Sequence, residues 1–145
     1  MSVVLRTARR GDVPALAGLM EAFAAEAQVG MPHDPALVRV TLAGLIDAPL
    51  GYVAVLDDGA PCGLLAGTAA SSPWFAGLLA EELAWWIAPE RRGRWARAML
   101  ADFEAWARGV GAVAVGMSDL TRDLGALYAR AGFARVECKH MKVLG

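Results

Sequence analysis

The chain has 145 residues, of which 57% are hydrophobic, so it can form one domain with a helix-covered sheet and leaves little room for a second. A net charge of -1 and a pI near 6.1 argue against a general nucleic-acid-binding protein, which would carry a basic excess. Cys62 and Cys138 form no CxxC pair, and His33 and His140 have no metal-ligand spacing, so we expect a reducing, cytoplasmic setting and no metal. The N-terminus has no apolar run typical of a signal peptide, and the uncharged stretch 59–80 contains prolines and polar residues, so we expect no membrane segment.

The first half of the chain predicts one strand, two helices and a hairpin. Residues 3–9 begin with β-branched side chains and predict a strand. Asp12 is placed to cap a helix whose apolar residues recur at helical spacing as far as Ala27. Asp34-Pro35 starts the second helix, with a capping residue followed by a proline in the first turn.

Asp57-Asp58-Gly59 is a hairpin turn signal between two expected strands, which cover 52–56 and 62–70. An apolar loop over 71–79 carries Trp74 and Phe75.

The second half alternates strands with helices, and Ser118, Asp119 or Thr121 can cap its short helix. The expected elements are, in order, a strand over 82–88, a helix over 95–108, a strand over 112–117, a short helix ended by Gly132 and a final strand over 133–143. This alternation implies crossover connections and some parallel pairing, whereas the hairpin implies antiparallel pairing. We therefore predict a single α/β (α+β) domain over 1–145, with a mixed sheet and helices on both faces.

The strongest functional signal is the strand, turn and helix over residues 85–107. The strand ends at Pro89, and four arginines then fall within seven residues, namely Arg91, Arg92, Arg94 and Arg97. A helix start offers free backbone N–H groups and a partial positive charge, where phosphates bind readily. Arginines add charge-assisted hydrogen bonds to phosphate oxygens. The turn suits a pyrophosphate and not a magnesium triphosphate, because the Lys-Ser/Thr pair of a P-loop is missing.

At this point the sequence resembles the GNAT superfamily of N-acetyltransferases. The resemblance is firm over roughly 81–133 and is carried by Ile87-Ala88-Pro89, Arg92-Gly93, Trp106-Ala107, Gly111-Ala112 and the run Leu127-Tyr128 to Gly132-Phe133. It implies a GNAT-like, mostly antiparallel sheet and acetyl-CoA as co-substrate, with no metal. The implied cofactor-binding residues are Trp86, Ile87, Ala88, Arg91, Arg92, Gly93, Arg94, Trp95, Ala96 and Arg97.

The turn departs from the family pattern, which usually reads Arg/Gln-x-x-Gly-x-Gly/Ala. Alignment from its two flanks places the family glycines either on Trp95 and Arg97 or on Arg94 and Ala96. We therefore predict a turn one residue shorter than usual. Backbone N–H groups survive any side-chain change, so they remain available to a pyrophosphate.

The resemblance implies that a neutral amine attacks the thioester directly, without a covalent enzyme intermediate. The protein would contribute positioning and a backbone N–H for the oxyanion, at Ile87 or Ala88. Tyr128 matches the family tyrosine near the CoA sulfur and would donate a hydrogen bond to the leaving thiolate. Full proton transfer from a phenol near pKa 10 to a thiolate near 8.5 is uphill by roughly 1.5 units.

Two adjacent carboxylates, Glu81 and Glu82, are candidates for the general base. Strand alternation would place Glu82 with Ala84 and Trp86, and Glu81 on the opposite face, so only one can meet the acceptor. The sequence does not choose between them. Asp119 is a third candidate, although a helix cap is the alternative interpretation. Thr121 holds the place where the family often has an asparagine.

The acceptor is expected to be an amine on a small molecule or peptide, with no role for nucleic acid or membrane. Trp74, Phe75 and residues 28–34 are expected to border it, or to contact a second subunit in a homodimer. One alternative is a non-catalytic or degenerate acyl-CoA-binding module. Another is an apolar α/β protein that works by self-association, for which no CoA binding is expected.

Overall fold

The fold is seen in a computed structural model that describes residues 2–120 and 123–145. Its elements are β1 (Val4–Thr7), α1 (Val13–Ala27), α2 (Pro35–Asp47), β2 (Gly51–Asp57), β3 (Pro61–Ser71), β4 (Leu78–Ile87), α3 (Arg94–Gly109), β5 (Ala112–Gly116) and α4 (Gly125–Arg130). Two short 3-10 turns, Arg10–Asp12 and Pro89–Arg91, precede α1 and α3.

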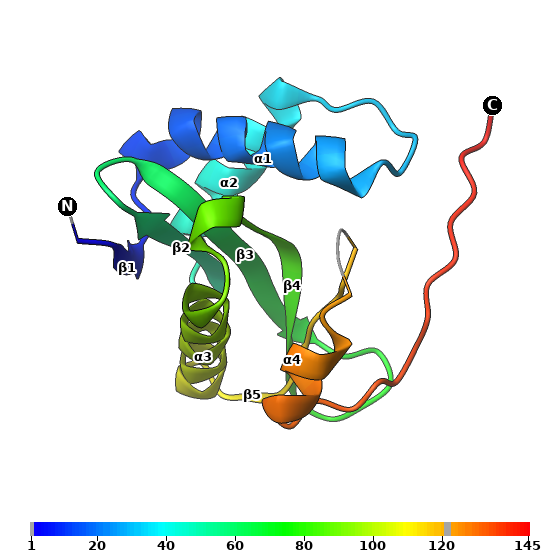
Figure 1. Cartoon of the computed structure of the whole chain (residues 1–145). Coiled ribbons are helices and arrows are strands. Elements are labelled where there is room, and N and C mark those ends of the chain that lie inside the picture. The colour runs from blue at the N-terminus through cyan, green and yellow to red at the C-terminus, as the bar shows by residue number, and fades with distance from the viewer. Residues whose placement is uncertain (1, 121–122) are drawn as a thin grey trace.

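The five strands form one sheet in the order β1-β2-β3-β4-β5. The first four strands pair antiparallel, and β5 pairs parallel with β4 after the α3 crossover. Helices α1 and α2 cover one face and α3 covers the other, as Figure 1 shows. The predicted mixed, mostly antiparallel sheet with helices on both faces is therefore confirmed.

Each face of the sheet has its own apolar core. Met99 and Phe103 of α3 are fully buried against β2, β3 and β4, while Leu16 and Leu42 bury α1 and α2 on the other face. Fully burying a side chain of this size is worth about 1.5–3 kcal/mol. Two complete cores fix the central strands, and with them the position of β4.

The two predicted helix starts differ in outcome. Asp34 caps α2 as expected, because its Oδ1 accepts hydrogen bonds from the backbone N–H groups of Ala36 and Leu37, both at 3.1 Å. Asp12 makes no side-chain cap bond to α1. Its carboxylate is held instead by both terminal nitrogens of Arg6, at 2.8 and 2.9 Å.

The predicted short helix begins later than expected. α4 starts at Gly125, and its N-cap residue Leu124 has no side-chain hydrogen bond, so Ser118 and Asp119 do not cap it. Thr121 lies outside the described residues. β4 begins at Leu78 instead of 82, which shortens the loop after β3 to residues 72–77.

The predicted final strand over 133–143 is not formed. Residues 134–145 are exposed and have no strand assignment, and the segment leads away from the body in Figure 1. Alternating polarity creates a strand only where a neighbouring edge supplies the ladder of hydrogen bonds, and this segment lies on no such edge of its own sheet.

Within the described residues, no helix is both long and apolar enough to cross a membrane.

Candidate active site

The sheet opens along β4. Only Leu78–Glu81 of β4 pair with β5, so the described strands leave the rest of that edge, as far as Ile87, without a partner. The N–H of Ala88 donates to the Cys62 carbonyl on β3 at 2.8 Å. Because alternate residues of a strand point to opposite sides, the N–H of Ile87 faces the open side. Of the two predicted oxyanion donors, Ala88 is thus already engaged and Ile87 is directed to open space.

A β-bulge lies where this open edge begins. Ala66 of β3 pairs with Ala84 while its neighbour Gly67 pairs with Glu82, so Leu83 is the extra residue on β4. Gly67 is needed there, because a methyl group on it would lie 2.7 Å from the Phe103 ring and 2.8 Å from the Glu81 carbonyl. Leu83 itself is 52% exposed.

The bulge places Glu82 on a different face from the one that simple alternation predicts. Gly67 meets α3, so its partner Glu82 faces the α3 side. Ala84 is buried and pairs with Ala66, which belongs to the core beneath α1 and α2, so Ala84 faces that side. The expectation that Glu82 shares a face with Ala84 and Trp86 is therefore wrong, because one additional residue reverses the parity of the strand.

Glu82 lies in a polar cluster with Ser118. Its Oε2 accepts hydrogen bonds from the Ser118 hydroxyl at 2.7 Å and from the Ser118 backbone N–H at 3.2 Å. Burial raises the pKa of the Glu82 carboxyl, and the two hydrogen bonds from Ser118 oppose that rise without cancelling it. Glu82 is thus a carboxylate of increased basicity, held in place by one residue.

Tyr128 joins the same cluster from α4. Its hydroxyl donates to the Ser118 carbonyl at 2.5 Å, and its ring lies 6.4 Å from the Trp85 ring. Burial raises the pKa of Tyr128, and the negative charges of Glu82 and Asp119 raise it further. The phenol is therefore held in its protonated, hydrogen-bond-donating form.

Ser118 connects the two candidate groups and was not assigned this role from the sequence. No local sequence signal marks it, because its approach to Glu82 depends on the register in which β5 pairs with β4, with Gly116 opposite Glu81. Glu81, the other candidate base, is exposed. It lies beside Gly116 of β5, where an added methyl group would be 3.5 Å from the Glu81 Cγ.

The turn before α3 is shaped by Gly93. This residue has φ +89° and ψ -116°, a conformation that only glycine adopts readily, and space around it is open. The N–H groups of Arg94 and Trp95 follow and precede the first intrahelical hydrogen bonds, which begin at Ala96. The helix start therefore presents backbone donors to solvent.

The four arginines of the turn have different surroundings. Arg91 pairs with Asp58 of the β2–β3 hairpin at 2.9 Å, and Arg92 donates to the Ile87 carbonyl at 2.7 Å. Arg94 lies over the Trp95 ring at 5.0 Å and is exposed, as is Arg97. Two arginines thus stabilise the turn, and two project outward where a phosphate can approach.

Glu26, near the end of α1, ties the turn to the other side of the sheet. Its Oε1 accepts from Arg92 at 2.9 Å and from the Trp86 indole N–H at 3.0 Å. Trp86 therefore packs beneath α1, with the Arg92 guanidinium 5.8 Å from its ring centre. Sixty-six residues separate Glu26 from Arg92, and no local pattern marks this pair.

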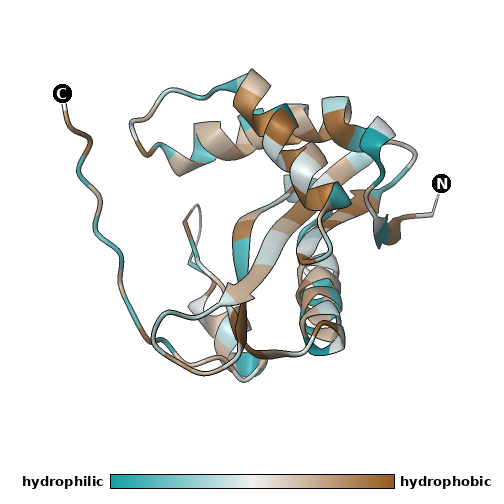
Figure 2. Ribbon diagram, turned by 180° about the vertical axis from the view of Figure 1, so that it is seen from behind, coloured by the Kyte–Doolittle hydropathy of each residue, from teal (hydrophilic) through white to brown (hydrophobic). Residues whose placement is uncertain are grey.

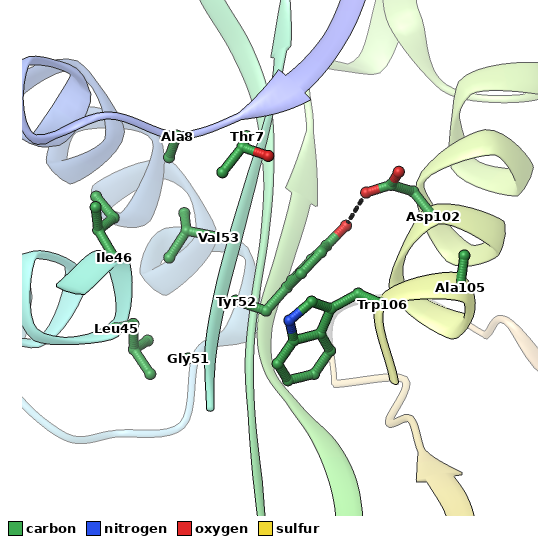
Figure 3. Close-up of a pocket in the computed structure, with 10 residues that line it drawn as sticks. All are labelled: Thr7, Ala8, Leu45, Ile46, Gly51, Tyr52, Val53, Asp102, Ala105 and Trp106. Atoms are coloured by element: carbon green, nitrogen blue, oxygen red, sulfur yellow. Dashed lines mark hydrogen bonds between the residues drawn. The ribbon is translucent and has the colours of Figure 1, made fainter. Parts of the chain in front are cut away.

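A separate hollow of about 270 Å³ lies on the β1–β2 side of the sheet, between α2 and α3. Figure 3 shows Tyr52 and Trp106 on one side of it and Leu45 and Ile46 on the other. The Tyr52 hydroxyl donates to Asp102 at 2.5 Å, and burial raises the pKa of this phenol. None of the predicted site residues lines this hollow, so it is distinct from the β4 site.

The residues that were expected to border the acceptor differ in how exposed they are. Trp74 and Phe75 are 84% and 77% exposed at the tip of the loop before β4. His33 is half-buried in the α1–α2 connection, and its Nε2 has no hydrogen-bond partner among the described residues. Across residues 2–120 and 123–145, no group of three or more His, Cys, Asp or Glu side chains is arranged to hold a metal ion.

Solved structures of similar shape cover nearly the whole chain. An integron cassette protein from the mobile metagenome of Cole Harbour Salt Marsh, HFX_CASS3, is 25% identical, with a TM-score of 0.79 over 97% of this chain and 89% of its own. A GCN5-related N-acetyltransferase from Ralstonia eutropha JMP134 is 18% identical, with a TM-score of 0.77 over 99% of this chain and 100% of its own.

AAC(6')-Iy, solved with the bisubstrate analogue CoA-S-monomethyl-acetylneamine, is 13% identical, with a TM-score of 0.77 over 100% of this chain and 99% of its own. No curated protein sequence matches this chain. The acetyltransferase (GNAT) family model matches residues 16–133, which include the β4 edge, the arginine turn and Tyr128. The chain therefore belongs to the GNAT family of acetyltransferases.

Proposed function

We propose that this protein transfers the acetyl group of acetyl-CoA to a primary amine by direct attack. The observation that carries the proposal is the convergence of Glu82 and Tyr128 on Ser118, at the point where β5 stops pairing with β4. A carboxylate and a phenol are thus held beside an open strand edge, and these groups suit the roles of base and hydrogen-bond donor in acyl transfer to an amine.

The acetyl-CoA would lie along the open edge of β4, with its pyrophosphate at the start of α3. The N–H groups of Arg94 and Trp95 and the exposed Arg94 and Arg97 side chains supply donors and positive charge there. The thioester carbonyl would accept from the N–H of Ile87, which faces the same edge.

Glu82 would act as the general base. It takes a proton from the acceptor amine, directly or through one water, so that the nitrogen lone pair attacks the thioester carbon. The C–N bond forms as the C–S bond breaks, and the nitrogen loses a second proton to give the amide. That proton neutralises the CoA thiolate, which leaves as the thiol. Tyr128 would turn its hydroxyl from the Ser118 carbonyl and donate a hydrogen bond to that thiolate. The raised pKa of the phenol favours this hydrogen bond over full proton transfer to the thiolate.

We base the proposed acceptor class on the similar solved structures and not on a pocket in this chain. AAC(6')-Iy was solved with a CoA–neamine bisubstrate analogue, and another similar structure, 18% identical, is an aminoglycoside acetyltransferase from a soil metagenome. Both act on amines of small molecules, and a small-molecule amine is the acceptor class that we propose here.

The experiment is a pair of measurements with acetyl-CoA. A thermal shift tests binding, and a ligand at a hundred times its dissociation constant should stabilise the fold by about 2.7 kcal/mol. Thiol release across a panel of small amines then tests turnover. A shift in melting temperature accompanied by amine-dependent thiol release supports the proposal, and the absence of any shift with acetyl-CoA or CoA contradicts it.

A non-catalytic acyl-CoA-binding module is the second candidate. It is favoured by the engagement of Arg91 and Arg92 in contacts within the protein, which leaves fewer side chains for the pyrophosphate. Stabilisation by CoA without thiol release across the amine panel would identify this function.

A further inference from the structure

Arg92 folds back over the end of β4. Its Nε donates to the Ile87 carbonyl at 2.7 Å, and one of its terminal nitrogens donates to Glu26 Oε1 at 2.9 Å. Only 22% of the Arg92 side chain is exposed. In Figure 1 and in the reverse view of Figure 2, the turn that carries Arg92 lies between the start of α3 and the layer formed by α1 and α2. The guanidinium is thus held against the protein and is not directed outward.

The Ile87 carbonyl that Arg92 holds lies on the same strand edge as the proposed oxyanion donor. The N–H of Ala88 donates to the Cys62 carbonyl on β3, and Ile87 lies opposite Gly63. In an antiparallel ladder the hydrogen-bonded and non-hydrogen-bonded pairs alternate, so Ile87 turns both its N–H and its C=O away from β3. The two groups therefore lie side by side on the open edge, and Arg92 engages the carbonyl.

An unpaired carbonyl at this position would oppose the proposed reaction. The thioester oxygen becomes negative as the amine attacks, and the partial negative charge of the Ile87 carbonyl oxygen would repel it. A hydrogen bond from the Arg92 guanidinium offsets that partial charge and brings a full positive charge to the same edge. The edge then presents an N–H donor beside a cation, which favours an oxyanion.

Glu26 of α1 fixes Arg92 in this position. Its Oε1 also accepts from the Trp86 indole N–H at 3.0 Å, and the Arg92 guanidinium lies 5.8 Å from the Trp86 ring centre. Trp86 directly precedes the donor residue in β4. One carboxylate thus secures both the side chain that comes before Ile87 and the guanidinium that holds the Ile87 carbonyl.

We propose that Arg92 acts at the acyl-transfer centre and not at the pyrophosphate, and that Glu26 positions it there. Both are positioning residues, because they act on the thioester oxygen through Ile87. The inference rests on the proposed function. It divides the arginines of the turn by role and assigns the pyrophosphate to the helix start, with the exposed Arg94 and Arg97.

The first test compares two acetyl donors, acetyl-CoA and S-acetyl-pantetheine, since the second has the same thioester but no pyrophosphate. Arg92→Ala should lower kcat/KM by about 10–100-fold with either donor, which is less than the about 10²–10³-fold cost of removing an oxyanion donor outright. The dissociation constant for CoA, measured by titration, should stay within about threefold of the wild-type value. Arg94→Ala should raise that constant, which shows that the titration detects the loss of a pyrophosphate contact.

The second test uses variants of Glu26. Glu26→Ala should lower kcat/KM as Arg92→Ala does, and the double variant should lose little more than either single variant, because residues that act as a unit are not additive. Glu26→Gln keeps an oxygen for both donors and should restore most of the rate. Glu21→Ala, which removes an exposed glutamate from the same helix, is the matched control and should leave the rate unchanged. Thermal melting checks that each variant is folded at the assay temperature.

The outcomes separate this inference from the proposed function. A wild type that releases no thiol with any amine refutes the proposed function and this assignment together. If the wild type turns over, the assignment alone is overturned when kcat/KM survives Arg92→Ala or Glu26→Ala. It is also overturned when Arg92→Ala weakens CoA binding, because that result indicates a contact with the pyrophosphate.

Discussion

Replacement of Glu82 by Gln tests the proposed base most sharply. The variant keeps an oxygen that accepts from the Ser118 hydroxyl and N–H, so the cluster remains intact, but the side chain no longer accepts a proton. A positioned general base contributes about 10²–10⁴-fold, which corresponds to about 2.7–5.4 kcal/mol of transition-state stabilisation at 1.36 kcal/mol per tenfold. We expect kcat/KM to fall by that factor while the thermal shift with acetyl-CoA is retained.

The pKa of Glu82 adds a signature in pH that a purely structural role would lack. The base must be ionised, so kcat/KM of the wild type should rise with pH through a pKa above the usual glutamate value, and this limb should be absent in Glu82→Gln. The effect on stability has the opposite sign to the effect on activity. A carboxyl whose folded pKa is raised stabilises the fold below its unfolded pKa, and that contribution is lost as pH rises through the folded value.

The variant should therefore be at least as stable as the wild type at neutral pH, although it is far less active. The assay is thiol release over a pH series, with urea unfolding in parallel. Glu81→Gln is the matched control, because Glu81 is the adjacent, exposed glutamate and should keep activity within about threefold. Equal losses in both variants, or an unchanged rate in Glu82→Gln, would refute the assignment of the base.

Three further predictions use other parts of the site and fold. Tyr128→Phe should lower kcat by about 10–150-fold, the value of one charge-assisted hydrogen bond, with little change in CoA affinity. The control Tyr52→Phe should leave kcat unchanged. The reverse pattern would remove Tyr128 from the mechanism. Gly93→Ala introduces about 1–3 kcal/mol of backbone strain at φ +89° and should weaken CoA binding in a titration, and unchanged affinity would argue against a pyrophosphate at this turn. Asp34→Ala should cost about 1 kcal/mol in urea unfolding without changing turnover, and a loss below about 0.3 kcal/mol would show that the cap is unimportant.

Elements defined by neighbouring residues were predicted correctly from the sequence. The Asp57-Asp58-Gly59 turn connects β2 to β3, and the Asp57 carboxylate accepts from the Gly59 N–H at 2.8 Å. The Asp34 cap and the apolar stripe of α3 were equally local signals. In each case the residues that determine the structure lie within one or two turns of one another.

The bulge at Leu83 could not be predicted in this way. Nothing in the run from Leu78 to Ile87 marks an extra residue, and the bulge lies where Phe103, from another element, approaches Gly67 closely. Because one additional residue reverses the side-chain faces of a strand, the orientation of Glu82 was predicted incorrectly even though the strand itself was recognised.

Contacts between distant segments account for the remaining differences. Glu82 and Ser118 are 36 residues apart, and Arg92 and Glu26 are 66 apart, so their pairing depends on the topology of the sheet. The arginine turn was expected to bind phosphate with all four guanidinium groups, but Arg91 and Arg92 are held by Asp58 and Glu26. The strand pattern after α4 was real in the sequence but has no partner within its own sheet.

The most direct test of the account is the mass spectrum of a small-amine panel after incubation with acetyl-CoA, compared between wild type and Glu82→Gln at equal protein concentration. We predict an N-acetylated amine with the wild type, matched one to one by released CoA thiol, and about 10²–10⁴-fold less product with the variant. Equal amounts of product from both proteins would contradict the placement of the chemistry at the open edge of β4.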